Sequence, residues 1–418
     1  MKKLLLLLLL PGLLGACSSS DVPAANRDAD PGTDDGGLPE DAAETGEDGG
    51  RPSGDAGAPP ADSGTGLSDG GPEPEDAGRG DPDTNSPDSG AGCAEPTPFV
   101  APGAPAGWRH DSTRLFTVTQ GAANHRAQDV IVQEGEPQLI VGKFAYGVFD
   151  KDLKDEEVEV FIQERPPCGG WTSLGVQLTS EEGQYGDQYG IADDGGRIFF
   201  PLPAEQARPV GRYPLRLLVR GDESQAALTL TVLPAATSTV VFDIDGTLTT
   251  ADFELITELF TELFAGEYVP EMRDGAPEIV WRWASKGYLV VYLTGRPDFL
   301  HRQSLDWLVA KGFPPGPLHL TDTTGQALPS AGGVGTYKTE FLSKIKDEGG
   351  VFLDAAYGNA TTDIQAYAAA GIPLESTFII GDHGGEGGTV GLVGYPEHLA
   401  EAQAMPAATV AAPAAVGW

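Results

Sequence analysis

Hydrophobic and polar residues follow two different patterns along the folded part of the chain. From about 94 to 236, short apolar runs are separated by turns, and several alternate strictly, as at Leu228, Leu230 and Val232. Alternation with a period of two predicts strands that bury one face. The strands expected here are Arg114–Thr119, Asp129–Val132, Gln138–Tyr146, Glu157–Gln163, Trp171–Leu178, Gly196–Pro201, Tyr213–Arg220 and Ala226–Val232.

The regular spacing of these short strands, without any long helical period, predicts an antiparallel β-sandwich of immunoglobulin-like type. From 238 to about 400, apolar runs alternate with helical periods instead. That alternation predicts an α/β fold with a doubly wound parallel sheet. The expected strands are Thr239–Asp243, Gly287–Thr294, Pro317–Thr321, Val351–Ala355 and Thr377–Gly381, and the expected helices cover about 252–265, 274–286, 298–311, 338–347 and 361–371.

The first residues differ from both patterns. Met1–Ala16 contain two lysines followed by seven consecutive leucines, an apolar run too short to span a bilayer. This layout predicts a secretory signal. Leu14-Gly15-Ala16-Cys17 resembles a bacterial lipobox, in which the cysteine is lipidated and becomes the mature N-terminus. The alternative is an ordinary signal peptide with a chance cysteine. The resemblance implies a lipid-anchored protein of the bacterial cell envelope, and Ser18 favours the outer membrane.

Residues 18–92 consist largely of Asp, Gly, Pro, Ala and Ser, with 19 acidic residues and three arginines, a net charge of −16. Such a composition buries too little apolar surface to offset chain entropy, and it predicts a disordered acidic linker. The whole chain carries a net charge of −36, so the remainder is acidic as well. This charge argues against a nucleic-acid partner.

Two cysteines remain beyond the lipobox. Cys93 and Cys168 form an even pair in a chain expected to be exported, which predicts a disulfide. Two free buried thiols are the alternative. No cluster of cysteine and histidine has the spacing of a zinc site.

The most informative polar positions come directly after an apolar run. Val240-Val241-Phe242 leads into Asp243 and Asp245, which are followed by Gly246 and Thr247. Open parallel sheets place their ligands at the carboxyl ends of strands. Two carboxylates there, with a glycine that frees the turn and a hydroxyl, predict a site for Mg²⁺ and a phosphate group. For an isolated motif, the alternative is a strand followed by an acidic turn.

Three more groups follow at strand ends or helix starts. Thr294 ends the second expected strand before Gly295-Arg296, where a hydroxyl and the amides of the next helix can bind phosphoryl oxygens. Lys338 begins a helix, and its ammonium can neutralise a phosphate and an attacking carboxylate. Asn359 and Asp363 follow another strand and offer oxygen ligands to Mg²⁺.

Taken in this order, these groups resemble the haloacid dehalogenase-like phosphatase superfamily, whose first motif is DxDGT. The resemblance implies that Asp243 attacks phosphorus to form an aspartyl-phosphate, while Asp245 protonates the leaving alkoxide and then activates water. It also implies a magnesium site formed by Asp243, Asp245 through its carbonyl, and Asn359, with Asp363 orienting these ligands from behind. Thr294 and Lys338 complete the implied catalytic set, and the implied substrate-binding positions are Gly246, Thr247, Gly295 and Arg296.

Two families give a narrower resemblance. The stretch DIDGTLTTAD that begins at Asp243, and GNATTD with the downstream GIP, look like the lipin phosphatidate phosphatases. The stretch from Gly287 to Asp298 looks more like the lipid-sensing domain of phosphatidylinositol-transfer proteins. The preceding sandwich resembles a domain that precedes such phosphatase domains in bacterial proteins. Ala360 stands where lipins usually carry arginine. The transfer-protein relatives have lost the nucleophile, so its presence here as Asp243 favours an active enzyme.

Some positions keep two interpretations. The apolar face of the helix expected at 252–265 suits either an acyl-chain contact or ordinary packing. Arg296 and Arg302 can bind a phosphate headgroup at two points, or they can be surface or salt-bridge residues. His383 fits a loop residue better than a metal ligand.

The sequence thus predicts a Mg²⁺-dependent phosphatase whose substrate is phosphatidic acid or a related lipid phosphate monoester, reached through the N-terminal lipid anchor. A soluble phosphomonoesterase of the cell envelope and a non-catalytic lipid-binding module are the alternatives, and the oligomeric state is not predicted. The expected parts are a signal peptide with lipobox over 1–17, a linker over 18–92, the sandwich over 93–236, the phosphatase domain over 237–400 and a flexible tail over 401–418.

Overall fold

The computed structural model describes residues 96–418 except for 148, 189, 252–268, 323–325 and 328–330. The predicted signal with Cys17, the acidic linker, Cys93 and the helix expected at 252–265 therefore lie outside the described residues. The described part belongs to one unit that runs from Thr84 to Trp418.

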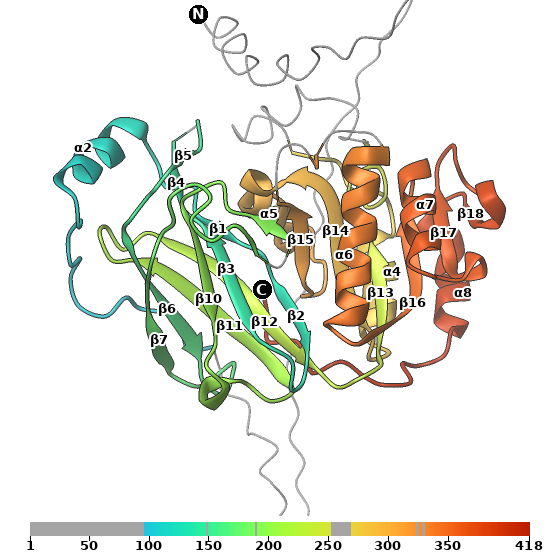
Figure 1. Ribbon diagram of the computed structural model, residues 1–418. Coiled ribbons are helices and arrows are strands. Elements are labelled where there is room, and N and C mark those ends of the chain that lie inside the picture. Colours follow the sequence, from blue (N-terminus) through green and yellow to red (C-terminus); the bar gives the residue numbers. More distant parts are fainter. Residues whose placement is uncertain (1–95, 148, 189, 252–268, 323–325, 328–330) are drawn as a thin grey trace, which may run out of the picture. The chain divides into compact units, whose positions relative to one another are not determined.

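The C-terminal part is built on a six-stranded sheet with the order β15-β14-β13-β16-β17-β18, and all five strand pairs are parallel (Figure 1). This confirms the predicted parallel sheet. The strands are β13 (Thr237–Phe242), β14 (Leu289–Pro297), β15 (Leu318–Thr321), β16 (Val351–Gly358), β17 (Thr377–Ile380) and β18 (Val390–Leu392).

Helices cover both faces of this sheet, so alternate side chains of its strands enter two different cores. On β13, Val240 and Phe242 pack in the core with α4, α5 and α8, whereas Val241 packs in the core with α6 and α7. Burial on both faces explains why β13 is a continuous apolar run. The helices are α4 (Ala276–Ala284), α5 (His301–Ala310), α6 (Thr336–Asp347), α7 (Thr361–Ala369) and α8 (Tyr395–Ala404).

Helix α4 shows how local sequence sets these elements. Gly275, at φ 74°, precedes its first turn, and Pro277 occupies that turn, where a proline costs no helical hydrogen bond. The buried side chains Ala276, Ile279 and Trp283 recur at helical spacing and face the sheet. Short helical turns occur at Ala204–Gln206, Asp298–Leu300, Ala331–Gly335, Leu374–Ser376 and Glu386–Gly388.

The β-sandwich precedes this domain, as predicted. A five-stranded sheet with the order β2-β12-β11-β6-β7 and a three-stranded sheet with the order β1-β3-β10 enclose a shared core. Strand β2 pairs with β12 in parallel, so the sandwich is not purely antiparallel. The strands are β1 (Arg126–Ala127), β2 (Val130–Gln133), β3 (Leu139–Lys143), β4 (Ala145–Tyr146), β5 (Lys151–Asp152), β6 (Glu157–Gln163), β7 (Trp171–Leu178), β8 (Asp187–Gln188), β9 (Ile191–Ala192), β10 (Arg197–Pro201), β11 (Gly211–Val219) and β12 (Gln225–Leu233).

The strand predicted at Arg114–Thr119 is wrong, because these residues lie in helix α2 (Asp111–Gln120). Its threonines and valine favour strands when taken alone. Thr113 and Phe116, three residues apart, face the sandwich, whereas Leu115 is 69% exposed. A strand would have placed Thr113 and Phe116 on opposite faces, so packing selects the helix.

The flexible tail predicted over 401–418 is also not what the structure shows. Helix α8 continues to Ala404, and the irregular segment after it is held by hydrogen bonds from the Ala408 and Ala412 amides to Lys286 and Gly287. A Cβ on Gly287 would lie 3.1 Å from the Ala411 Cβ. The small side chains that suggest a loose tail instead let it approach the domain closely.

Cys168 is disulfide-bonded. Close to it, the Thr97 amide donates to the Pro167 carbonyl (2.9 Å) and the Thr97 hydroxyl to the Cys168 carbonyl (2.8 Å). These contacts place Thr97, four residues after Cys93 in the sequence, beside Cys168. The Cys93–Cys168 pairing itself stays a prediction.

Side chains of the sandwich cap the outer edge of the parallel sheet. The Gln128 amide donates to the Leu320 carbonyl (2.8 Å) and accepts from the Leu320 amide (3.2 Å), and the Asp129 carboxylate accepts from the Leu318 amide (2.8 Å). Both leucines belong to the edge strand β15 and are fully buried. The sandwich therefore supplies hydrogen bonds that a further strand would otherwise supply.

We predict that Gln128→Ala lowers the free energy of unfolding by about 2 kcal/mol, because it leaves the buried amide and carbonyl of Leu320 without partners. Urea denaturation of the purified protein measures this. Gln403→Ala is the matched control: Gln403 accepts one exposed hydrogen bond from Arg282, and its loss should change stability by less than about 0.5 kcal/mol. Equal effects of the two variants would contradict the edge-capping role of Gln128.

Candidate active site

The predicted site residues meet at the carboxyl ends of three neighbouring strands. Asp243 and Asp245 follow β13, Thr294 and Arg296 lie in the last part of β14, and Asn359 follows β16. The side chains of the first four are almost completely buried. Gly295 lies within β14 between Thr294 and Arg296, and no separate role is evident for it.

The turn after β13 lies against Asn359. Gly246 has φ 72°, and a Cβ there would lie 2.2 Å from the Asn359 side-chain nitrogen. The Thr247 hydroxyl lies 2.8 Å from Asp243 Oδ2 and 3.1 Å from Asn359 Oδ1. Glycine is therefore required at 246 both by its backbone conformation and by the close approach of Asn359.

A buried lysine links two carboxylates. Lys338 of α6 donates from Nζ to Asp243 Oδ1 (2.9 Å) and to Asp363 Oδ1 (2.7 Å), and all three side chains are 0–1% exposed. The other Asp363 oxygen accepts from the backbone amides of Asn359 (3.0 Å) and Ala360 (3.1 Å). Asp363 thus orients both Lys338 and the Asn359 backbone, and both of its oxygens are already engaged.

The second aspartate is held by Arg296. Its Nε lies 2.9 Å from Asp245 Oδ2, its Nη2 lies 2.6 Å from Oδ1, and its Nη1 donates to Ser304 Oγ (3.0 Å). The Thr294 hydroxyl also donates to Asp245 Oδ2 (2.9 Å). Of the two interpretations kept for Arg296, the structure shows the salt bridge, and this pair is fully buried.

The other arginine considered for a headgroup is not part of the site. Arg302 is 83% exposed and pairs at 3.8 Å with Asp306 on the same helix. His383 lies in the loop after β17, where its Nδ1 is 3.0 Å from Glu386. These residues remain outside the cluster around Asp243.

Two residues that the sequence did not suggest also support the turn. The Tyr395 hydroxyl donates to the Thr247 carbonyl (3.0 Å), and Arg273 Nε donates to the Gly246 carbonyl (2.9 Å). Burial raises the pKa of Tyr395 above its usual range, so its hydroxyl stays protonated as a donor. Both residues act on backbone groups, which leave no pattern in the sequence.

The site contains oxygen donors of the kind that divalent cations bind. In the part of the chain that the structure describes, no group of three or more His, Cys, Asp or Glu side chains is placed to hold a metal ion. Asp243 Oδ2 and Asn359 Oδ1, however, lie 2.8 Å and 3.1 Å from the same Thr247 hydroxyl, so these two oxygens face one point. Mg²⁺ usually takes one or two carboxylates and keeps several waters, so these oxygens fit Mg²⁺.

Comparison with known families agrees with this architecture. Residues 240–381 match the family model described as the LNS2 domain of PITM 1-3, and residues 123–232 match the model of the PITM 1-3 beta-sandwich domain. Over these ranges the chain thus resembles a β-sandwich followed by an LNS2 domain. The predicted resemblance to a domain of phosphatidylinositol-transfer proteins is confirmed.

Individual relatives carry both parts. Protein retinal degeneration B of Drosophila melanogaster is 34% identical over 288 residues, covering 68% of this chain and 20% of that protein. Human membrane-associated phosphatidylinositol transfer protein 1 is 33% identical over 293 residues, covering 70% and 21%. Human membrane-associated phosphatidylinositol transfer protein 3 is 33% identical over 275 residues, covering 65% and 25%. The chain therefore spans about a fifth to a quarter of the length of these relatives.

Solved structures add little. A phosphoserine phosphatase from T. onnurineus is 17% identical, covers 41% of this chain and 96% of its own, and has a TM-score of 0.26, which is too low to show a shared fold. Within the described ranges, no helix is both long enough and apolar enough to cross a membrane.

We predict that Gly246→Ala lowers the free energy of unfolding by about 3 kcal/mol, since the new methyl group meets Asn359 and the backbone has positive φ. Gly312→Ala separates the two causes. Gly312 also has positive φ (77°) but nothing within 4 Å of a Cβ, so about 1 kcal/mol is expected. Urea denaturation measures both, and a Gly246→Ala cost no larger than that of Gly312→Ala would exclude the close contact with Asn359.

Proposed function

We propose that the domain hydrolyses a phosphate monoester, with Asp243 as nucleophile. The observation that carries the proposal is the pair of contacts on this carboxylate, with Lys338 at one oxygen and Thr247 at the other. They fix its orientation and offset its negative charge where a phosphate dianion would approach. Such charge compensation is what attack by a carboxylate on phosphorus requires.

In this mechanism an oxygen of Asp243 forms a bond to phosphorus while the bond to the ester oxygen breaks. Asp245 gives its proton to the departing alkoxide. Water then attacks the aspartyl-phosphate, Asp245 takes a proton from that water, and inorganic phosphate leaves. Asp243, the Asp245 carbonyl and Asn359 would hold Mg²⁺, which reduces repulsion between the two anions when bound. Asp363 keeps Lys338 and Asn359 in place throughout.

The proposed substrate is phosphatidic acid or a related lipid phosphate monoester. The lipin-like stretches support a lipid, as do relatives whose names refer to phosphatidylinositol transfer and membrane association. The net charge of −36 opposes attraction to an anionic membrane. We therefore propose that the predicted lipid anchor at Cys17 in a bacterial envelope supplies proximity to the membrane, which raises the effective substrate concentration.

One observation favours a second function, a lipid-binding module without turnover. Arg296 engages both oxygens of Asp245 in a fully buried ion pair, so Asp245 can act as acid and base only if it exchanges this partner for the substrate. A module that only binds needs no such exchange. Phosphate release from phosphatidic acid in mixed micelles, with and without Mg²⁺ and against soluble esters, separates these functions: binding without release would select the second one.

We predict that Asp243→Asn reduces phosphate release by roughly a factor of 1,000 or more, because the amide of the same shape cannot form the aspartyl-phosphate. Asp306→Asn, on the exposed face of α5, is the control and should retain activity. Thermal unfolding of both variants checks the fold. If Asp243→Asn released phosphate at the rate of the unchanged protein, Asp243 would not be the nucleophile.

We predict that Cys17→Ser moves the protein from the membrane fraction to the soluble fraction of cells that express it. Stable anchoring needs more than one acyl chain, so mass spectrometry of the unchanged protein should show several chains on Cys17 and no Met1. An intact N-terminus without lipid mass would refute the anchor.

A further inference from the structure

Three buried cations lie in one row across the three-stranded sheet of the sandwich. Lys143 of β3 pairs in register with Arg126 of β1 on one side and with Arg197 of β10 on the other, and all three are 4–6% exposed. Like charges placed directly opposite each other destabilise a sheet, so carboxylates have to compensate this row. Asp298 and Asp322 of the C-terminal domain line a small cavity together with the three cations. The row therefore faces that domain.

Arg126 is shared between the two domains. Its Nη1 and Nη2 donate to the two carboxylate oxygens of Asp150 in the sandwich, at 2.7 and 2.6 Å. In the C-terminal domain, Asp298 Oδ1 accepts from Nη2 (3.1 Å), and Asp298 Oδ2 lies 3.0 Å from Nε. A guanidinium that meets a carboxylate at two points is held in one orientation. Asp298 is thus fixed relative to the sandwich, at a place where its side chain is only 12% exposed.

Asp298 adjoins the site arginine. It follows Arg296 by two residues, directly after β14, and it begins the turn that leads into α5. Ser304 of α5 accepts a hydrogen bond from Arg296 Nη1 (3.0 Å). Asp298 therefore lies in the chain between Arg296 and one of the partners that hold its guanidinium.

A second arginine of the row supports the same strand end. Arg197 Nη2 donates to the Asp322 carbonyl (3.0 Å). The preceding residue, Thr321, pairs with Pro297 of β14, and its hydroxyl donates to the Arg296 carbonyl (3.2 Å). The sandwich thus reaches the backbone around Arg296 through two arginines.

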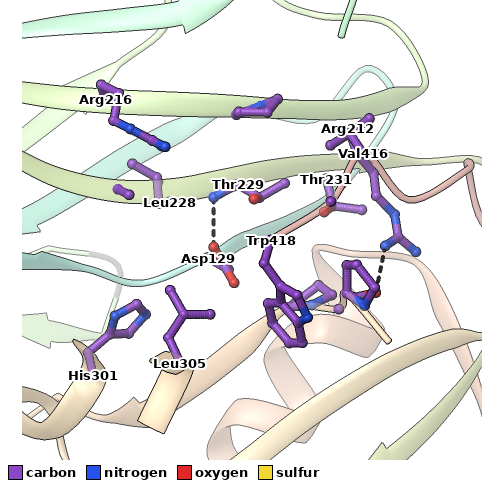
Figure 2. A pocket seen from close by; sticks show the side chains of 16 residues that line it. Asp129, Arg212, Arg216, Leu228, Thr229, Thr231, His301, Leu305, Val416 and Trp418 are labelled. Carbon is purple, nitrogen blue, oxygen red and sulfur yellow. Dashed lines mark hydrogen bonds between the residues drawn. The ribbon is translucent and has the colours of Figure 1, made fainter. Parts of the chain in front are cut away.

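The side of α5 that faces the sandwich is not closely packed against it along its whole length. Figure 2 shows His301 and Leu305 of α5 across from Asp129 and the strands of the five-stranded sheet, and a cavity of about 170 Å³ lies between them. This space leaves α5 room to move against the sandwich, and the Arg126–Asp298 pair opposes such a movement at the start of the helix.

We propose that Arg126 is a positioning residue for the phosphate site. Through Asp298 it fixes the end of β14, so that the guanidinium of Arg296 stays beside Asp245, where an incoming phosphate would meet it. The inference rests on the proposed function, because it takes phosphate as the ligand at Arg296. Misplacing a site by about 1 Å costs a factor of about 100 in activity, so the loss of one tie at the strand end should be measurable as weaker phosphate binding.

Inorganic phosphate is the probe, titrated by calorimetry into the full-length protein in the presence of Mg²⁺, because its binding requires no turnover. We expect Arg126→Gln and Asp298→Asn each to weaken phosphate binding about tenfold. The double variant should bind about as weakly as Arg126→Gln alone, since both changes break the same pair.

Lys143→Gln is the matched control. Lys143 lies in the same row, but its partners in the described part of the chain, Asp152 (2.8 Å), Asp194 (3.0 Å) and the Gly195 carbonyl (2.7 Å), all belong to the sandwich. This variant should lower the unfolding temperature as Arg126→Gln does, yet leave the phosphate affinity unchanged. If Arg126 only stabilised the fold, the two variants would have equal phosphate affinities.

Hydrogen exchange of the segment 293–300 reports on the strand end without any ligand. Exchange there should be faster in Arg126→Gln and Asp298→Asn than in the unchanged protein, and unaltered in Lys143→Gln. Should Arg126→Gln fail to fold, Asp298→Asn, which keeps the shape of the side chain, decides alone.

Unaltered exchange in Asp298→Asn, equal phosphate affinities of Asp298→Asn and Lys143→Gln, or no phosphate binding by the unchanged protein would each overturn the positioning role. Phosphate binding that responds to these variants, without release of phosphate from any ester, would support the positioning role while rejecting the proposed hydrolysis.

Discussion

The buried ion pairs at the ends of β13 and β14 are the interaction on which the site depends. Three carboxylates, those of Asp243, Asp245 and Asp363, are almost completely buried, and an unpaired buried charge costs several kcal/mol. Lys338 serves two of them and Arg296 serves the third. Lys338 belongs to α6 and Arg296 to β14. The need to pair the buried carboxylates therefore fixes where this helix and the end of this strand lie.

This balance also sets what the site can do. The three carboxylates and the two cations together carry one excess negative charge. Because the charges of a divalent cation and a phosphate dianion cancel, the two can enter together without a large change in the net charge of the site. Arg296 has two possible partners. Its guanidinium now binds both oxygens of the Asp245 carboxylate, and an incoming phosphate would offer it two oxygens in a similar geometry. Under the proposed function, hydrolysis of the substrate requires that exchange, whereas binding alone does not.

Sequence reasoning succeeded where a local pattern and a packing constraint agree. The bounds of β6 and β7 follow directly from alternation, and the positions of Asp243, Thr294 and Asn359 follow from the rule that polar residues after buried strands share one edge of a sheet. It failed where the deciding contact is distant in sequence. Helix α2 is selected by the side on which Phe116 packs, and the segment after α8 is held by the backbone near Gly287. The partner of Arg296 lies 51 residues away, and a guanidinium beside a strand end suits a ligand as well as an aspartate.

The capped edge of β15 has a consequence for how this chain avoids self-association. An uncovered edge strand is a template for pairing with another chain, and the opposite edge, β18, is only three residues long with a glycine at its centre. Gln128 precedes Leu320 by 192 residues, so the cover of this edge comes from a distant part of the same chain. Removing the sandwich would therefore expose β15 to pairing with a second chain, while the sheet itself would keep all of its strands.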